Sequence, residues 1–138
     1  MGGDASVLQV VVDDREARCG VVEVLRRHPE VTVMVRRLTV GDYVVDGRLV
    51  VERKRLIDFA ASVKDGRLFR QGLRLAEVGA WRALILEGVS RDLAASGMAR
   101  EALQGALVTV GLFMGVPVLR SRDLDESVQL LLFAGRQG

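Results

Sequence analysis

The stretch from Gly41 to Lys54 constrains the fold of this chain more than any other. Its apolar, β-branched residues flank an Asp46-Gly47 pair, a pattern that predicts two strands joined by a tight turn. A two-residue turn would place Asp42 and Glu52 on opposite faces of the hairpin, because side chains alternate along a strand. A three-residue loop over 45–47, with its glycine in the left-handed conformation as a bulge, places both carboxylates on one face. We predict the bulged register.

Lys54 follows Glu52 by two residues and therefore shares its face. In the predicted register, Asp42, Glu52 and Lys54 lie roughly 5 to 8 Å apart. Mg²⁺ is usually held by one or two carboxylates and keeps positions for water and phosphate oxygens, and Mn²⁺ can replace it. A lysine beside such an ion can orient or deprotonate an attacking water. On this motif alone, a surface hairpin with solvated charges remains an alternative, since acids and lysine are common residues.

The apolar run over 7–13 predicts a buried strand that ends in an acid, Asp13. An acid that closes such a strand lies at the edge of the sheet, where metal ligands are common. The competing interpretation is a helix cap, because Asp13 and Asp14 both precede the next predicted helix. The residues by themselves leave both interpretations open.

Four short blocks stand in a fixed order along the chain: Val12-Asp13-Asp14-Arg15-Glu16, Val40-Gly41-Asp42-Tyr43, Val51-Glu52-Arg53-Lys54 with Asp58, and Asp65-Gly66-Arg67-Leu68-Phe69. This order strongly resembles the nuclease domain of the XPF/Hef family of structure-specific DNA endonucleases. In letters, the family pattern is V-D-x-R-E, G-D-Y, E-R-K-x-x-x-D and D/N-G-R-L-F/Y. The resemblance continues through Ile85-Leu86-Glu87-Gly88 and Gly115-Val116-Pro117-Val118, and it covers roughly residues 7–136. The family is a branch of the restriction-endonuclease-like nucleases.

The resemblance implies a catalytic set and a metal site. The implied catalytic residues are Asp13, Asp42, Glu52, Arg53 and Lys54. The metal ligands among them are Asp13, Asp42 and Glu52, while Lys54 serves the attacking water. Asp14 stands at a variable position of the family pattern, so we interpret it as the helix cap.

Supporting residues surround that set. Arg15 and Glu16 are expected to line the acidic cluster, and Arg53 and Arg67 are expected to bind DNA phosphates. Asp58 lies one helical turn past Lys54, so it is positioned either to hold that lysine or to form a routine pair on the helix surface.

The fold class expected from alternating strands and helices is α/β, with a central mixed β-sheet of about five or six strands flanked by helices. The restriction-endonuclease-like topology follows from the resemblance. We expect a single nuclease domain over 1–138, with its core at about 7–136 and without the helix-hairpin-helix module that many relatives carry. The residue patterns predict helices over 16–28, 55–64, 67–78, 98–114 and 125–134, and a loop over 89–97.

The composition of the chain excludes some kinds of site but does not indicate a function. The net charge of +2 does not by itself indicate a nucleic-acid partner. Only Lys54 and Lys64 are lysines among the 20 basic residues, so a lysine kept at position 54 supports a specific need there. One cysteine excludes an internal disulfide and a cysteine zinc cluster. The chain shows neither a signal peptide nor an apolar run near twenty residues, so we expect a soluble, intracellular protein without membrane association, cytoplasmic if prokaryotic.

The activity implied by the resemblance is Mg²⁺- or Mn²⁺-dependent hydrolysis of DNA phosphodiesters, at branched duplexes such as flaps or forks. Two alternatives remain. The chain is a non-catalytic subunit that binds DNA or forms a dimer, or it is a restriction or repair nuclease of the same fold with another substrate. The intact set of Asp42, Glu52 and Lys54 favours an active enzyme over the subunit.

Two helices, 98–114 and 125–134, predict a homodimer or heterodimer. From Leu103 onward the first is apolar on nearly every face, so its own sheet cannot cover it. A patch beyond a few hundred Å² is unusual for a monomer, and pairing two copies through a twofold interface would bury it. The resemblance agrees, since nuclease domains of this family form dimers. Covering by a further module or by an intramolecular contact is the alternative, and the dimer requires Leu112, Phe113 or Phe133 to be exposed.

Overall fold

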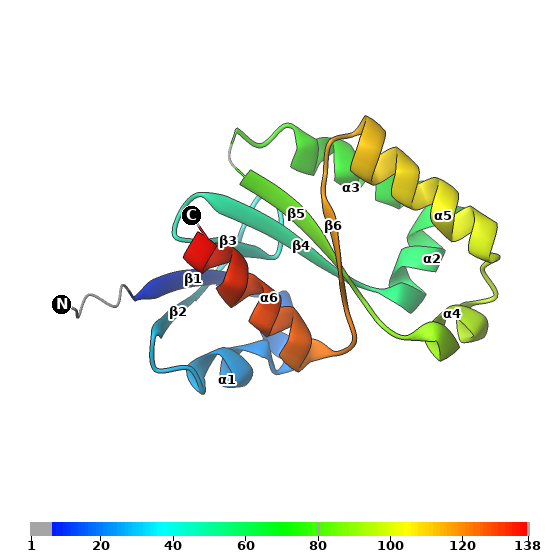
Figure 1. The fold of residues 1–138 in the computed structure, drawn as a ribbon. Coiled ribbons are helices and arrows are strands. Elements are labelled where there is room, and N and C mark those ends of the chain that lie inside the picture. Colours follow the sequence, from blue (N-terminus) through cyan, green and yellow to red (C-terminus); the bar gives the residue numbers. More distant parts are fainter. Residues whose placement is uncertain (1–6, 80, 138) are drawn as a thin grey trace.

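A six-stranded mixed sheet forms the centre of the computed structural model, which describes residues 7–79 and 81–137 (Figure 1). The strands are β1 (Leu8–Asp13), β2 (Val31–Arg36), β3 (Tyr43–Val45), β4 (Leu49–Arg55), β5 (Trp81–Glu87) and β6 (Val118–Ser121). They lie in the order β2-β1-β3-β4-β5-β6. β1 pairs with β2 and β4–β6 pair with one another in parallel, whereas β3 is antiparallel to both of its neighbours. The predicted α/β class with a central mixed sheet is confirmed.

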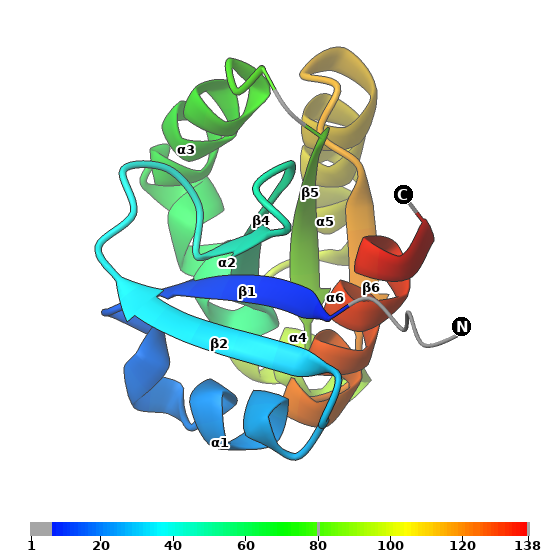
Figure 2. The same cartoon turned by 90° about the vertical axis from the view of Figure 1, so that its left-hand side faces the viewer.

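Helices cover both faces of this sheet (Figure 2). They are α1 (Val21–Arg26), α2 (Leu56–Lys64), α3 (Arg67–Ala76), α4 (Ser90–Ser96), α5 (Arg100–Val108) and α6 (Leu124–Gln137). A 3₁₀ turn (Glu16–Cys19) precedes α1, and a π-helical turn (Thr109–Phe113) extends α5. Within the described residues, none of these helices is long and apolar enough to cross a membrane.

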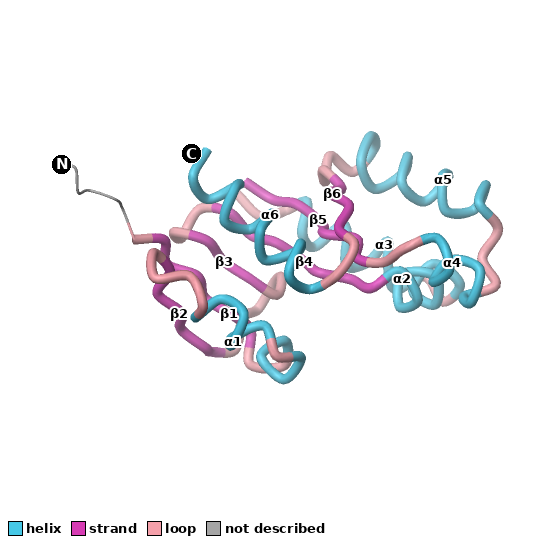
Figure 3. The backbone as a smooth tube through the Cα atoms, turned by 60° about the horizontal axis from the view of Figure 1, so that its bottom comes forward, coloured by secondary structure: helices cyan, strands magenta, loops and turns pink. Residues whose placement is uncertain are grey.

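Two apolar cores, one on each face, hold the layers together. Val50 and Leu84 point into the core under α2, α3 and α5. Their neighbours Val51 and Ile85 point into the core under α1 and α6. Figure 3 shows α6 across the middle strands and α1 beside β1 and β2. Because both faces are covered, the central strands are apolar on both sides, as their near-continuous valine and leucine runs predict.

Some predicted elements differ from those observed. The predicted helix over 16–28 is interrupted at Gly20, whose φ of 90° places it in the left-handed region. The predicted loop over 89–97 contains α4 instead. That helix begins where the Asp92 carboxylate accepts a hydrogen bond from the Val89 backbone, at 2.7 Å, and it ends at Gly97 with a φ of 73°. A side-chain cap and a left-handed glycine therefore define a short helix that apolar periodicity could not reveal.

The hairpin of β3 and β4 has the predicted alternation but a different loop. Tyr43 pairs with Val51 and Val45 pairs with Leu49, so Asp42 and Glu52 project from the same face. The predicted loop over 45–47 is wrong by one residue, because three residues, 46–48, separate the paired ends. Its first two residues both have positive φ values, 51° and 68°.

Candidate functional site

A pocket of about 320 Å³ opens where the end of β1, the β2–β3 connection, β4 and α3 meet. Asp13, Asp42 and Glu52 all line it, so the fold brings the three predicted carboxylates to one place. The other lining residues are Arg15, Glu16, Thr39, Val40, Gly41, Gln71, Arg74 and Leu75. Lys54 lines a smaller adjacent pocket, which Glu52 and Gln71 share.

Backbone geometry fixes Asp42 opposite Glu52. The Asp42 backbone donates a hydrogen bond to the Val51 carbonyl at 2.8 Å. One carboxylate oxygen of Asp42 accepts from the backbone N–H of Arg53, also at 2.8 Å. Gly41 makes this approach possible, since its φ is +79° and a Cβ there would lie 2.6 Å from Cγ1 of Val50.

These two carboxylates resist ionisation. Burial, followed by the charge of Glu52, raises the pKa of Asp42 to about 8. Burial also raises the pKa of Glu52, although the positive charge of Lys54 opposes this shift. Two acids held together in a poorly hydrated pocket are relieved by a divalent cation, which displaces their protons. Asp42 and Glu52 therefore fit a hard metal ion.

Asp13 has a different environment. Its side chain is only 1% exposed and accepts four hydrogen bonds, three from Arg15 and one from the Leu38 backbone, at 2.8–3.2 Å. The hydrogen bonds from the Arg15 side chain are the main reason why the pKa of Asp13 falls to about 2. Within residues 7–79 and 81–137, no group of three or more His, Cys, Asp or Glu side chains is placed to hold a metal. Asp13 lines the same pocket as Asp42 and Glu52, but Arg15 and the Leu38 backbone already bind its oxygens, so its place among the metal ligands stays a prediction.

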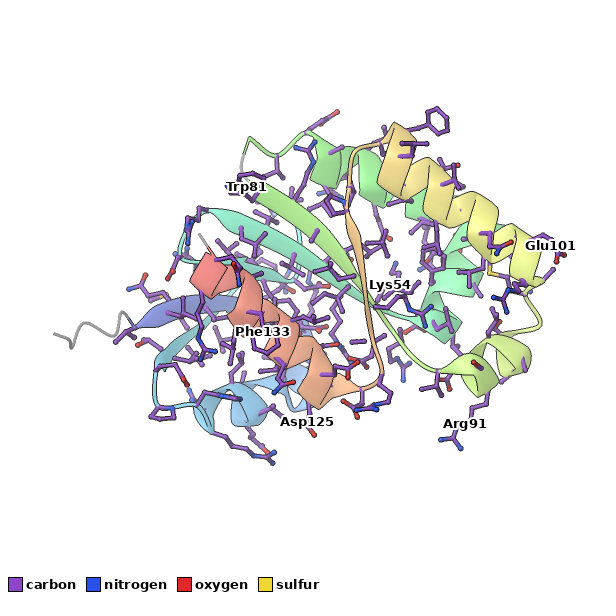
Figure 4. The ribbon with its side chains drawn as sticks, in the orientation of Figure 1. Lys54, Trp81, Arg91, Glu101, Asp125 and Phe133 are labelled. Atoms are coloured by element: carbon purple, nitrogen blue, oxygen red, sulfur yellow. The ribbon has the colours of Figure 1, made fainter. Side chains whose placement is uncertain are left out.

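Lys54 extends from β4 toward α2 (Figure 4). Its Nζ donates to Oγ of Ser62 at 3.1 Å and to Oε1 of Gln71 at 2.6 Å. Of the two roles considered for Asp58, holding Lys54 is not the one observed, since Asp58 pairs with Arg55 on the exposed side of α2 at 3.0 Å. The surface-pair alternative is the one observed.

Sequence reasoning missed Ser62 and Gln71, although a signal was present. Gln71 lies three residues after Leu68 and four before Leu75, within the buried stripe of α3. Ser62 follows the buried Phe59 by three residues on α2. A polar residue at an apolar position of a helical repeat requires a partner, which here is Lys54.

Arg53 points away from the pocket. Its guanidinium binds Glu87 through two hydrogen bonds and Glu16 through a third, at 2.7–2.9 Å. Glu87 also accepts from the Ser127 hydroxyl at 2.7 Å, and the Tyr43 hydroxyl donates to Glu16. The Arg53 side chain is 10% exposed. Alternation along β4 places Arg53 on the opposite face from its two neighbours, which does not favour the expected contact with DNA phosphates, and that contact stays a prediction.

Other arginines are better placed at the pocket. Arg15 and Arg74 line it, and Arg74 donates to the Thr39 carbonyl at 3.0 Å. Arg67 is exposed and pairs with Asp65 at 2.8 Å, outside the residues that line the pocket. Its contact with DNA stays a prediction.

Residues 12–133 match the model of the ERCC4 domain. This chain belongs to the ERCC4 domain family. It is 35% identical over 125 residues to the 3'-flap repair endonuclease Xpf of Saccharolobus solfataricus, an alignment that covers 91% of this chain and 53% of that relative. It is 32% identical over 83 residues to the crossover junction endonuclease MUS81 of Gibberella zeae, covering 59% of this chain and 14% of that one.

A solved structure, XPF from Aeropyrum pernix in complex with DNA, shares the fold with a TM-score of 0.80 and 33% identity. The match covers 94% of this chain and 64% of that one. The chain thus spans about half of the Saccharolobus protein and less than two thirds of the Aeropyrum chain. The resemblance to the XPF-type nuclease domain and the restriction-endonuclease-like fold are confirmed.

Proposed function

We propose that this chain is the nuclease unit of a structure-specific DNA endonuclease that uses Mg²⁺ or Mn²⁺. The observation that carries the proposal is the pair of facing carboxylates, Asp42 and Glu52, with Lys54 on the same face of β4. The alternative of a non-catalytic subunit is less favoured, because nothing in such a subunit requires two acids and a lysine to be gathered, half-buried, at one pocket. The names of two relatives, an endonuclease for 3'-flaps and one for crossover junctions, support branched DNA as the substrate.

Asp42 and Glu52 would hold the metal ion, because both line the same pocket and a cation would offset the charges that burial disfavours when their pKa values are raised. When bound, the ion supplies Lewis-acid stabilisation of the charge that builds on the phosphate. Two carboxylates suffice for Mg²⁺, which keeps several waters and phosphate oxygens as its other ligands. Asp13 lines the same pocket and holds Arg15 in place at its edge.

Lys54, in its uncharged form, orients the attacking water and takes up one of its protons at Nζ, in the position set by Ser62 and Gln71. The water oxygen forms a bond to phosphorus while the bond from phosphorus to the sugar oxygen breaks, and that oxygen takes up a proton. Arg15 and Arg74, at the edge of the same pocket, bind neighbouring phosphates, because a guanidinium donates two hydrogen bonds to one phosphate.

Cleavage of end-labelled flap, fork and linear duplexes with Mg²⁺, Mn²⁺ or EDTA tests the proposal. Glu52→Gln removes one charge and keeps the shape, so it should lower the cleavage rate by roughly 10³-fold or more, equivalent to about 4 kcal/mol. Glu101→Gln makes the same change on the exposed face of α5 and should leave the rate unchanged (Figure 4). A folded Glu52→Gln variant that cuts at the wild-type rate would overturn the assignment of the site.

We also propose a dimer through α5, the π-helical turn and α6. Leu112, Phe113 and Phe133 are 71%, 79% and 51% exposed, as the dimer requires. β6 lies at the edge of the sheet with α5 on one side and α6 on the other (Figure 2). The apolar side chains thus flank one edge, where a second copy or a related chain would cover them.

A further inference from the structure

Gln71 stands between the acidic pocket and Lys54. It lines the pocket that contains Asp42 and Glu52, and it also lines the smaller pocket that contains Lys54. It is the residue of α3 that reaches Nζ of Lys54, at 2.6 Å.

The contact with Lys54 determines which way the amide of Gln71 points. An ammonium group has only donors, so the atom 2.6 Å from Nζ must be the amide oxygen, Oε1. The NH₂ group is then on the far side of the amide carbon. Within the described part of the chain, Nε2 forms no hydrogen bond with another protein group, and it is not a buried atom without a partner. It is therefore available as a donor on the pocket side.

The amide is not needed to hold α3 against the sheet. Leu68, Gly72 and Leu75 already bury that face of the helix, and Gly72 is in close contact with the π-helical turn's neighbour, Met114. A neutral donor is also suited to this place, because a third carboxylate beside Asp42 and Glu52 would add a like charge to the same pocket.

We propose that Gln71 is a further substrate-binding residue, whose Nε2 donates a hydrogen bond to a non-bridging oxygen of the phosphodiester while its Oε1 positions Lys54. The proposal rests on the endonuclease function given above. One amide then both positions Nζ of Lys54, which serves the water, and donates to the phosphate. The water and the phosphate are therefore oriented together. Ser62 is a positioning residue only, since it contacts Lys54 and is buried away from the pocket.

Two replacements of Gln71 separate its two contacts. Gln71→Met keeps the length of the side chain and loses both hydrogen bonds. Gln71→Glu keeps an acceptor for Lys54 and loses the donor. In single-turnover cleavage of a 3'-flap duplex with Mg²⁺, both should be slower by about 100-fold, as is typical when one positioned donor to a reacting group is removed. Gln9→Met, at an exposed position of β1, is the matched control and should cut at the wild-type rate.

The pH profile distinguishes the donor from a mere anchor for Lys54. A glutamate beside Lys54 favours its charged form, so an effect that acts only through the lysine should be relieved at higher pH. Because Gln71→Glu lacks the Nε2 donor, we expect it to cleave at least 30-fold more slowly than the wild type at every pH between 7 and 9. Recovery to within about threefold of the wild type at pH 9 would assign Gln71 only the contact with Lys54 and overturn the proposal.

A second measurement does not depend on cleavage. The side-chain amide signals of Gln71 in a ¹H–¹⁵N NMR spectrum are identified by their loss in Gln71→Met. Adding the 3'-flap duplex with Ca²⁺ in place of Mg²⁺ should shift them, while those of Gln9 on β1 stay in place. Unshifted Gln71 signals with DNA bound would overturn the proposal. Shifted signals in a wild-type protein that cuts no substrate would instead refute the endonuclease function and leave the phosphate contact standing.

Discussion

The guanidinium of Arg53 and the carboxylate of Glu87 form a buried ion pair joined by two hydrogen bonds, of 2.9 and 2.7 Å. Their side chains are 10% and 9% exposed. The pair links β4 to β5, and through Ser127 it reaches α6. Arg53 thus stabilises the strand whose opposite face carries Glu52 and Lys54, and it does so without facing the pocket.

Removal of one partner of this pair should destabilise the fold. Arg53→Met leaves Glu87 buried without its main partner, so we expect the free energy of unfolding to fall by about 3–5 kcal/mol. Arg55→Met, two residues along the same strand, breaks only the exposed pair with Asp58 and should cost less than about 1 kcal/mol. Urea denaturation of the two variants measures the difference. Equal losses would mean that the Arg53–Glu87 pair contributes no more than a surface contact.

The hairpin shows how much of the site the sequence could predict. The alternation that joins Asp42, Glu52 and Lys54 follows from strand geometry, and the structure has it. The same rule places Arg53 on the other face, yet the family motif suggested a phosphate contact for it. Applied to every residue of the motif, alternation alone would have placed Arg53 on the other face from Glu52 and Lys54.

Asp13 marks the limit of sequence reasoning. Its position at the end of β1 was predictable, and the fold does place it at the pocket. Its four hydrogen bonds depend on the conformation of Arg15 and on the approach of Leu38, which is 25 residues away in sequence. A pattern of residue types does not specify such a tertiary contact. The partnership of Lys54 with Gln71 likewise depends on how α3 packs against β4.

The metal-free protein should become less stable as the pH rises. Asp42 has a pKa of about 8 in the fold against 3.8 as its ordinary value, so the folded state keeps a proton that the unfolded state releases. Stability therefore falls between about pH 4 and pH 8. Asp42→Asn removes this loss and should be more stable than the wild type at pH 8 by about 1–3 kcal/mol, because solvent screening reduces the full effect of about 1.4 kcal/mol per pKa unit.

Thermal unfolding in EDTA at pH 5 and pH 8 measures this effect. Asp125→Asn, an exposed replacement on α6 (Figure 4), is the control and should keep the wild-type pH dependence. If Asp42→Asn loses stability between these pH values as steeply as the wild type, Asp42 is not the group that retains the proton.

Gly41 should be more sensitive to replacement than Gly47. Both have positive φ values, so alanine at either costs about 1–2 kcal/mol for the left-handed backbone. At Gly41 the new Cβ would also lie 2.6 Å from Val50 and 3.3 Å from the Val51 carbonyl, whereas at Gly47 nothing lies within 4 Å. The overpacking adds about 1–2 kcal/mol. Urea denaturation should give Gly41→Ala a lower free energy of unfolding than Gly47→Ala. The reverse order would show that the Val50 side chain can move aside without loss of stability.

DNA binding should depend on salt through the arginines at the pocket. Arg74→Ala should weaken binding of a flap duplex and lower the slope of log K against log salt by about 1, because one phosphate contact is lost. Arg91, exposed on α4, is the control, and Arg91→Ala should leave the slope unchanged (Figure 4). Fluorescence anisotropy over a range of salt concentrations, with Ca²⁺ to prevent cleavage, measures both. Identical slopes for the two variants would remove Arg74 from the DNA-binding surface.

Light scattering tests the proposed dimer. At micromolar concentration the wild type should have twice the 15.1 kDa mass of the chain. Phe113, at the end of the π-helical turn, is 79% exposed and lies in the region that a second copy would cover. Phe113→Asp should therefore give the mass of one chain, because a buried, unpaired carboxylate is costly in an apolar interface.

Met34 provides the control. It is another exposed apolar residue, 54% exposed, but it lies on β2, at the opposite edge of the sheet from β6. Met34→Asp should keep the dimer mass. If Met34→Asp dissociates the dimer and Phe113→Asp does not, the interface lies at the β2 edge instead. A wild-type protein that scatters as a single chain would show that the exposed side chains of the π-helical turn and α6 do not pair two copies.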